Sequence, residues 1–521
     1  MIFGSYKGLV RKHGITHYVN AIFGIILIVV AIFMGLLIAV FPIGFTAKIA
    51  VLEVLMVVIA CAILSHSTDE KGNLGLMMLV TVWITFHACT PTYISFKVSY
   101  LPDLSPYRLA EWLIVATVFY RWASSRHFRI LFYQRVIDVS PMFGLLLAML
   151  GWSLICSFSG ESPLFSIVYV SKTWIFSTLF FVLFLVAVRT KEDIERIIFV
   201  ALLAALFATA IGMAEWFYKD NLFRSLFPSD PERMADLEWI VSERFRDGVY
   251  RVSSLFKHPL VFGEYLAMTL PFCFYFLTNA KRSIVRHCAI LGLIFIPIGI
   301  YVSHTRSSII ASVAGVIVYM IALAIGRSKV KSGRILVVAV TAIVACALMI
   351  MMLLLTKDML QGRTQGERGS STARVVMLDR GITLIKDSPV LGYGPGTGAS
   401  KIGKLSSTSG ITIDNYFLSV ALETGVPGLI LYICILIVPF GKLLQVTTRE
   451  RAGLIAAILG SIAVYIIIRS VLSLTYNQNY WLLLMSLLLL ANRLPDLIPN
   501  AKKKEADSGQ VRTDLDFSNK A

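Results

Sequence analysis

The sequence predicts an all-α, polytopic integral membrane protein, and three features lead to that prediction. The chain of 521 residues is 57% hydrophobic and 15% charged, and a soluble protein cannot bury so much apolar surface. Its apolar residues come in runs of about 18 to 22, the length with which an α-helix crosses a bilayer. Basic residues gather in alternate loops, as the positive-inside rule requires of cytoplasmic loops. We therefore expect about 12–14 transmembrane helices and two cytoplasmic termini.

The membrane-spanning helices follow from the apolar runs in chain order. Residues 1–20 form a basic cytoplasmic N-terminus, and the run at 21–40 is too long for a signal peptide and lacks a cleavage site. Further spans are expected at 46–64, 74–92, 106–122, 141–158, 166–188, 195–215, 259–279, 288–303, 308–325, 335–355, 426–441, 453–474 and 480–492. Residues 21–492 thus form one membrane domain, followed by a polar, disordered cytoplasmic tail at 493–521.

Two long outer loops, 216–258 and 356–412, carry basic residues that the positive-inside rule does not explain. Long loops cross the membrane largely regardless of charge, so the topology stands. The net charge of +17 therefore has two sources. Basic residues in the cytoplasmic loops set the topology, and basic residues in the outer loops are suited to binding anions. Nucleic acid is not an expected ligand outside the cell, whereas a phosphate-bearing lipid or glycan is.

The second outer loop contains an amphipathic helix. Its apolar positions follow a helical spacing at Val375, Leu378, Ile382 and Ile385. Arg374, Arg380 and Lys386 fall on its polar side, so we expect the helix to lie on the outer leaflet. The glycine-rich run at 392–398 resembles a phosphate cradle but lacks a strand and helix around it, which favours a turn.

The segment before the span at 259–279 holds the first candidate site. Arg251, Lys257 and His258 precede this span, and Glu264 lies one to two turns inside it. The basic residues could be interfacial anchors with Glu264 paired to one of them. An ionisable side chain within a span costs roughly 2.5–3.5 kcal/mol on insertion scales, which favours a functional role.

A short outer connection holds the second candidate, Arg306, next to His304. A guanidinium offers a fixed fork of donors that matches the oxygens of a phosphate group. The alternative is that Arg306 anchors a lipid headgroup.

The stretch "TIDNYFLSVALETGVPG" closes the second outer loop. Asp414 or Asn415 could cap the helix that begins at Tyr416, and capping alone could explain them. Glu423 precedes "TGVPG", which is expected to stop the helix. The nine residues from Asp414 to Glu423 correspond to about two and a half helical turns and roughly 13 Å. The two carboxylates are therefore expected to have separate roles rather than to form an acid/base pair.

These motifs together resemble the O-antigen ligase and Wzy-type polysaccharide polymerase superfamily over about residues 165–490. The resemblance is carried by Arg251 with "HPLVFGEYL", by "SHTRSS", by Arg374 through "DSPVLGYGPG", and by "DNYFLSVALETGVPGL". It implies transfer of a glycan from an undecaprenyl-pyrophosphate carrier to an acceptor glycan. The reaction would take place at the outer face of the bacterial cytoplasmic (inner) membrane, without a metal ion or other cofactor.

One departure from the family bears on the reaction. Ligases of the family carry His-Asn at the start of the closing motif, and here Asp414 replaces that histidine, while Asn415 and Glu423 fit. The departure favours polymerisation of exopolysaccharide or O-antigen repeat units, with a chain-length regulator as a further partner. Ligation of O-antigen onto lipid A core is the alternative.

The resemblance also implies roles for single residues. Arg251 and Arg306 would bind the pyrophosphate, Asp414 would act as general base, and Glu423 would position an arginine or the acceptor sugar. The expected substrate-binding residues are Arg374, Asn415, His258, Lys257, Glu264 and His304.

A flippase or transporter of lipid-linked oligosaccharide is the alternative from another class. Glu53, Lys172 and Arg469 lie within expected spans and could line a transport path. No internal repeat of the kind common in transporters is found, and the polar residues gather on one side of the membrane.

Overall fold

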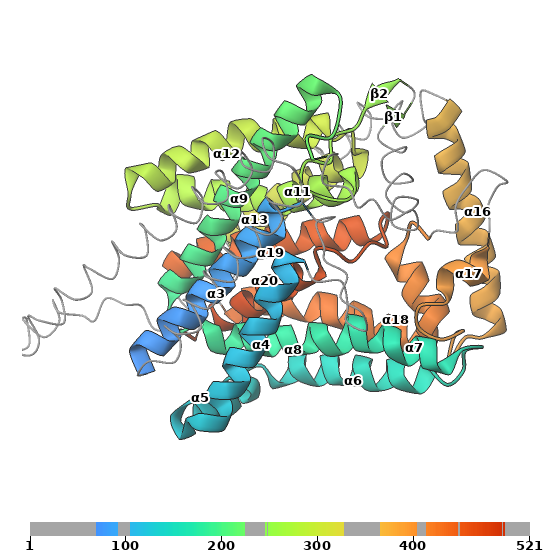
Figure 1. The fold of residues 1–521 in the computed structure, drawn as a ribbon, viewed down its shortest axis with the longest axis horizontal. Helices are drawn as coiled ribbons and strands as arrows, with labels where there is room; N and C mark the ends of the chain where they lie inside the picture. Colours follow the sequence, from blue (N-terminus) through green and yellow to red (C-terminus); the bar gives the residue numbers. More distant parts are fainter. Residues whose placement is uncertain are drawn as a thin grey trace, which may run out of the picture.

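A computed structural model describes residues 69–91, 105–223, 245–246, 248–327, 365–403, 413–445, 449–491 and 493–494 of the chain. These residues form helices almost throughout, with one hairpin of two two-residue strands (Figure 1). The elements are α3 (Asp69–Cys89), α4 (Pro106–Ser124), α5 (Arg126–Asp138), α6 (Ser140–Cys156), α7 (Pro163–Val170), the π-helical turn η1 (Ser171–Ile175), α8 (Phe176–Ala187), α9 (Lys191–Tyr218), β1 (Phe245–Arg246), β2 (Val249–Tyr250), α11 (Pro259–Asn279), α12 (Ser283–Val302), α13 (Arg306–Arg327), α16 (Gln365–Asp387), α17 (Gly398–Ile402), α18 (Tyr416–Ile437), the 3₁₀ helix η3 (Val438–Gln445), α19 (Arg449–Arg469) and α20 (Gln478–Leu490).

The all-α, polytopic membrane fold is confirmed. Among the described residues, seven helices are long and apolar enough to cross a membrane, and α5 with α6 makes an eighth if that pair, bent by 84°, is one span. Two shorter apolar helices, Gly75–Cys89 and Gln478–Leu490, accompany them. The spans expected at 21–40, 46–64 and 335–355 lie outside the described residues.

The centre of the bundle is formed by α19 and α20, with α11, α13 and α8 packed around them (Figure 1). Helices α13 and α19 touch along much of their length. A Cβ atom at Gly460 would meet the Gly315 carbonyl oxygen at 2.6 Å, so only glycine permits this approach. Small residues allow the same close contact between helices in other membrane proteins.

One end of the bundle, called the site end below, is where α6, α9, α12 and α19 finish and α7, α11, α13 and α18 begin. Figure 1 shows α16 and α17 at the right, across the beginning of α18, which both helices contact. The amphipathic helix predicted in the outer loop is therefore present as α16 and lies against this end.

The apolar stripe predicted on α16 is largely exposed. Val375, Leu378 and Ile382 are 68%, 47% and 45% exposed, which is compatible with the predicted position on the outer leaflet. Met377, by contrast, is buried against α18, and Ile385 packs on the same cluster. Gly381 permits this close approach, because a Cβ atom there would meet Leu418 at 2.7 Å.

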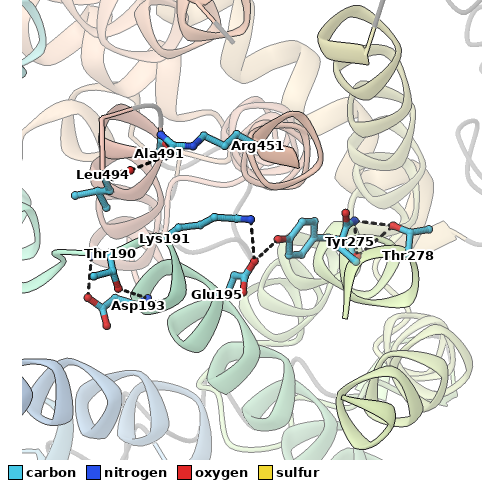
Figure 2. A network of polar contacts seen from close by, with 10 residues as sticks. Thr190, Lys191, Asp193, Glu195, Tyr275, Thr278, Arg451, Ala491 and Leu494 are labelled. Atoms are coloured by element: carbon cyan, nitrogen blue, oxygen red, sulfur yellow. Dashed lines mark hydrogen bonds and ion pairs between the residues drawn. The ribbon is translucent and has the colours of Figure 1, made fainter. Parts of the chain in front are cut away.

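The opposite end of the bundle is joined by polar contacts between helix ends (Figure 2). Glu195 of α9 accepts a hydrogen bond from the Tyr275 hydroxyl of α11 at 2.6 Å. Arg451, near the start of α19, donates to the carbonyls of Ala491 and Leu494 at 3.2 and 2.8 Å. The two Arg451 bonds satisfy carbonyls that the end of α20 leaves without helical partners.

Candidate functional site

The first group of site residues lies at the beginning of α18. Asn415 is the N-cap, and its side chain accepts a hydrogen bond from the Leu418 amide at 3.1 Å. The capping role that the sequence offered to either residue thus belongs to Asn415. The Asp414 carboxylate lies 3.4 Å from Nε of Arg374, and these side chains are 41% and 43% exposed. A reacting molecule can therefore reach this pair.

Helix α16 sets the position of Asp414 as well as that of Arg374. The backbone amide of Asp414 approaches Sδ of Met377 at 3.3 Å. Met377 is buried in a small cluster with Leu418 and Leu422 of α18. The packing of α16 on α18 therefore fixes the guanidinium and the carboxylate with respect to each other.

The helix stop predicted at "TGVPG" is confirmed. The helix that begins at Tyr416 is interrupted at Gly425, where φ is 69° and ψ is −175°, and a second helix follows across this kink to Ile437; the two together are α18. The span therefore starts at Tyr416, ten residues before the expected 426–441. Glycine reaches this backbone region, whereas side chains are strained in it.

The loop after α16 satisfies the backbone groups that the break in α18 frees. The Tyr393 and Gly394 amides donate to the Leu422 and Glu423 carbonyls at 2.8 and 3.1 Å. The Val426 amide donates in return to the Pro389 carbonyl at 2.8 Å, and the Trp152 indole of α6 donates to the Thr424 carbonyl at 2.8 Å. The break in α18 is therefore stabilised by specific hydrogen bonds from neighbouring segments.

Glu423 holds the glycine-rich run. Its carboxylate accepts hydrogen bonds from the Ser419 hydroxyl at 3.0 Å and from the backbone amides of Gly396 and Gly398. The run forms turns, as expected, with positive φ at Gly392, Gly394 and Gly396. Glu423 and Asp414 thus have different surroundings, in keeping with the separate roles inferred from helix geometry.

We expect Gly425→Ala to destabilise the site end. An added Cβ atom would meet the Val390 carbonyl oxygen at 2.1 Å, and strain of this kind costs about 1–3 kcal/mol. The matched control is Gly151→Ala in α6, where a Cβ atom meets nothing within 4 Å. Thermal unfolding in detergent should show a lower midpoint for Gly425→Ala alone. Equal midpoints for the two variants would contradict the strained break.

The second group of site residues surrounds Arg251, which follows β2. Glu215 at the end of α9 is buried and accepts hydrogen bonds from the Tyr250 hydroxyl at 2.8 Å and from the Ser253 and Ser254 amides at 3.3 and 2.6 Å. These bonds fix the segment on both sides of Arg251, a residue that is itself 8% exposed.

The same segment lies against the α12–α13 connection. The Val252 amide donates to the Val302 carbonyl at 3.2 Å, which brings Arg251 next to the loop containing His304 and leading to Arg306. His304 has a φ of 47°, a left-handed conformation that is uncommon for a residue other than glycine. The structure therefore brings two segments together that are some fifty residues apart in the sequence.

The beginning of α11 completes this group. The Nδ1 atom of His258 accepts a hydrogen bond from the Leu260 amide at 3.1 Å, so His258 is the N-cap of α11. A Cβ atom at Gly263 would meet Thr305 and Ser308 at 2.6 and 2.5 Å, which shows how closely α11 and α13 approach. Lys257 is exposed.

Burial lowers the pKa of His304, and the charges of Arg251 and Lys219 lower it further. His304 is therefore neutral at pH 7, and its imidazole takes up a proton only at a pH below that at which histidine side chains usually do so. The imidazole then adds a charge beside Arg251, so binding of an anion should be insensitive to this histidine near pH 7 and should strengthen as the pH falls below about 6.5. A pyrophosphate-binding titration should show this slope, and His304→Gln should flatten it. An equal slope in both proteins would exclude His304 as its cause.

Glu264 lies below these basic residues and is paired differently from the sequence-based alternative. It is fully buried and forms an ion pair with Arg469 of α19, not with Arg251, Lys257 or His258. Its other carboxylate oxygen accepts a hydrogen bond from the Asn477 side chain at 2.9 Å. This pair joins α11 to the α19–α20 connection beneath the site.

Three residues of the site were not found from the sequence. Glu215 and Trp152 orient backbone segments, and Asn477 bridges α20 to Glu264. Of these three, only Glu215 could have been recognised from the sequence. A carboxylate in the last turn of an apolar helix opposes the helix dipole and needs a local partner. Among the described residues, no group of three or more His, Cys, Asp or Glu side chains is arranged to hold a metal ion.

Part of the chain is similar to a known protein family. Residues 265–433 match the family model described as O-antigen ligase (Wzy_C). The matched segment contains Arg306, Arg374, Asp414 and Glu423, whereas Arg251 lies before it. The match confirms the resemblance to the O-antigen ligase and Wzy-type superfamily and indicates an activity of the ligase or polymerase type. No curated protein matches the chain.

Proposed function

We propose that this membrane protein polymerises undecaprenyl-pyrophosphate-linked repeat units of exopolysaccharide or O-antigen. The reaction takes place at the outer face of the bacterial cytoplasmic membrane, with both termini of the protein inside. The observation that carries the proposal is the half-exposed Asp414 carboxylate beside Arg374 at the start of α18. It occupies the position where the resembling ligases have a histidine.

In the proposed reaction, an acceptor sugar hydroxyl attacks C1 of the donor glycan. The bond from C1 to the pyrophosphate oxygen breaks, and the lipid pyrophosphate leaves with the electron pair of that bond. Asp414 takes the proton from the attacking hydroxyl as general base. Attack from the side opposite the leaving group inverts C1.

Arg251 and Arg306 stabilise the charge that develops on the leaving pyrophosphate. The Glu215 bonds support this role, because they hold the Arg251 segment against the loop that leads to Arg306. A guanidinium that is already in place does not have to reorganise during the reaction, and such preorganisation is the main source of electrostatic catalysis.

Glu423 supports the site through the glycine-rich run rather than through an arginine. Its hydrogen bonds to the Gly396 and Gly398 amides fix the loop that links α16 to α18. Arg374 guides the substrate and orients the Asp414 carboxylate, which it contacts. Asn415 and His258 cap the helices that present these groups.

A flippase or transporter is the alternative from another class, and two observations favour the enzyme over it. Arg469 is neutralised by Glu264 inside the bundle, so its charge is not available along a path. Lys172 lies in η1 on the exposed side of its span, with Val168 and Ile175. Glu53 lies outside the described residues.

Turnover in detergent tests the proposal. The purified protein receives a lipid-pyrophosphate oligosaccharide of one repeat unit, and the products are separated by length. The proposal predicts glycans of two or more repeat units although no second compartment exists. Unchanged donor, together with transport of the same lipid in vesicles, would support the transporter instead.

A further inference from the structure

A lysine lies on the exposed side of a membrane-spanning helix, at the centre of an apolar surface. Lys172 is part of η1, the π-helical turn between α7 and α8, and is exposed. Phe165 and Val168 before it are 55% and 44% exposed, and Ile175 and Leu179 after it are 42% and 37% exposed. We call these five residues the Lys172 stripe. All of its members except Lys172 suit an apolar contact.

The spacing of the Lys172 stripe is that of a seam between two packed helices. Its members follow one another at intervals of three, four, three and four residues, which is the heptad pattern of a packed helix pair. In such seams a single polar residue sets the register of the partner helix. All five members are exposed, so no helix among the described residues covers the seam. The stripe is therefore a face to which a further helix can dock.

The position of Lys172 within the span indicates what the docking helix carries. Pro163–Ala187 is a membrane span of 25 residues, and Lys172 is the tenth of them. Ionisable side chains at this depth usually pair with one another or with backbone carbonyls. Among the described residues, no carboxylate forms an ion pair with Lys172. The helix that fits the stripe therefore brings an aspartate or a glutamate to the same depth.

One span of this chain meets that requirement. The spans expected at 21–40, 46–64 and 335–355 lie outside the described residues, and Glu53 is the one acidic residue in their sequences. By the expected topology, the spans of Glu53 and Lys172 both run from the outer face inward. Glu53 is the eighth residue of 46–64, so the two side chains differ in depth by two residues, or about 3 Å of helix. A lysine side chain is long enough to cover that difference.

The chain connection keeps this span close to the helices that flank the stripe. Residues 65–68 alone separate it from α3, and four extended residues reach at most about 14 Å. Helix α3 packs against both α4 and α8. Trp112 of α4 borders the stripe, because its ring lies 5.6 Å from that of Phe176, and it is 44% exposed. A helix tied to α3 can therefore lie beside α4 on the stripe.

We propose that the span at 46–64 packs on the Lys172 stripe and that Glu53 forms an ion pair with Lys172 there. The span then covers the apolar members of the stripe, and neither charge faces lipid. Both charges serve to hold the bundle together, so neither is needed to explain a transport path. The contact is separate from the glycan reaction and does not depend on the proposed function.

Charge exchange in the full chain tests this contact. Lys172→Glu and Glu53→Lys each place two like charges together within the membrane, so each should lower the thermal midpoint in detergent. The double variant with both changes restores the pair and should regain most of the loss. In a cycle of Lys172→Gln and Glu53→Gln, the two losses should couple by about tenfold in the unfolding equilibrium constant. Lys281→Gln, at an exposed lysine between α11 and α12, is the matched control and should unfold as wild type does.

The location of the restoring charge identifies the helix on the stripe. The single variants Lys172→Glu and Glu53→Lys, expressed together as separate chains, should show no recovery. Recovery in that mixture would assign the stripe to a second copy of the chain and overturn the choice of 46–64. A Lys172→Gln protein with the wild-type midpoint would mean that the lysine extends to the membrane surface without a partner. That result, or a double exchange no more stable than either single one, would overturn the pair.

Discussion

Replacing Asp414 by asparagine is expected to lower glycan elongation by about 10²–10⁴-fold, the usual contribution of a general base. The amide keeps the shape of the side chain but cannot take a proton from the acceptor hydroxyl. Its oxygen still faces Arg374, which lies 3.4 Å from the carboxylate in wild type. The effect should therefore appear in the turnover rate, with the donor still bound.

The matched control is Asp379→Asn on α16, an exposed carboxylate in the helix that carries Arg374. Initial rates of elongation and protein levels in the membrane should be compared for both variants. The control should elongate as wild type does. An Asp414→Asn protein that elongates at the wild-type rate would remove the general base from the mechanism, whatever the result for the arginines.

The second large effect is expected at the buried ion pair beneath the site. Arg469→Met should lower the free energy of unfolding by about 3–5 kcal/mol, the cost of leaving one member of a buried pair alone. Glu264 and Arg469 are both fully buried, so water cannot replace the lost partner. Equilibrium unfolding in mixed detergent micelles measures this change.

Two further variants show whether the pair itself causes the loss. The double variant Glu264→Leu with Arg469→Met removes both charges and should recover most of the stability. Asp138→Asn breaks a half-exposed pair and should cost less than about 1 kcal/mol. If the double variant were as unstable as Arg469→Met, packing rather than the unpaired charge would explain the loss.

The sequence was a good guide to the elements because their signals are local. Apolar runs predicted the spans, and the spacing of apolar residues predicted α16. The sequence limited the N-cap of α18 to Asp414 or Asn415, and the structure assigns it to Asn415. Helix geometry alone separated Asp414 from Glu423, since it depends only on their distance along the chain.

Contacts between distant segments could not be predicted in the same way. Glu264 and Arg469 are far apart in the sequence, and nothing local to either residue identifies its partner. The helix stop at "TGVPG" was a sound local inference, but nothing local to the motif showed that a second helix would follow directly across the kink. Amides from the loop after α16 and the Trp152 indole bind the freed carbonyls, so α18 resumes after Gly425.

A competition between acceptors tests the central claim most directly. The purified protein receives one lipid-pyrophosphate repeat unit as donor, with a second repeat unit and lipid A core present together. Polymerisation predicts a ladder of lipid-pyrophosphate glycans of increasing length and an unmodified core. Transfer of single repeat units to the core, without any ladder, would contradict polymerisation and assign the chain to the ligases despite Asp414.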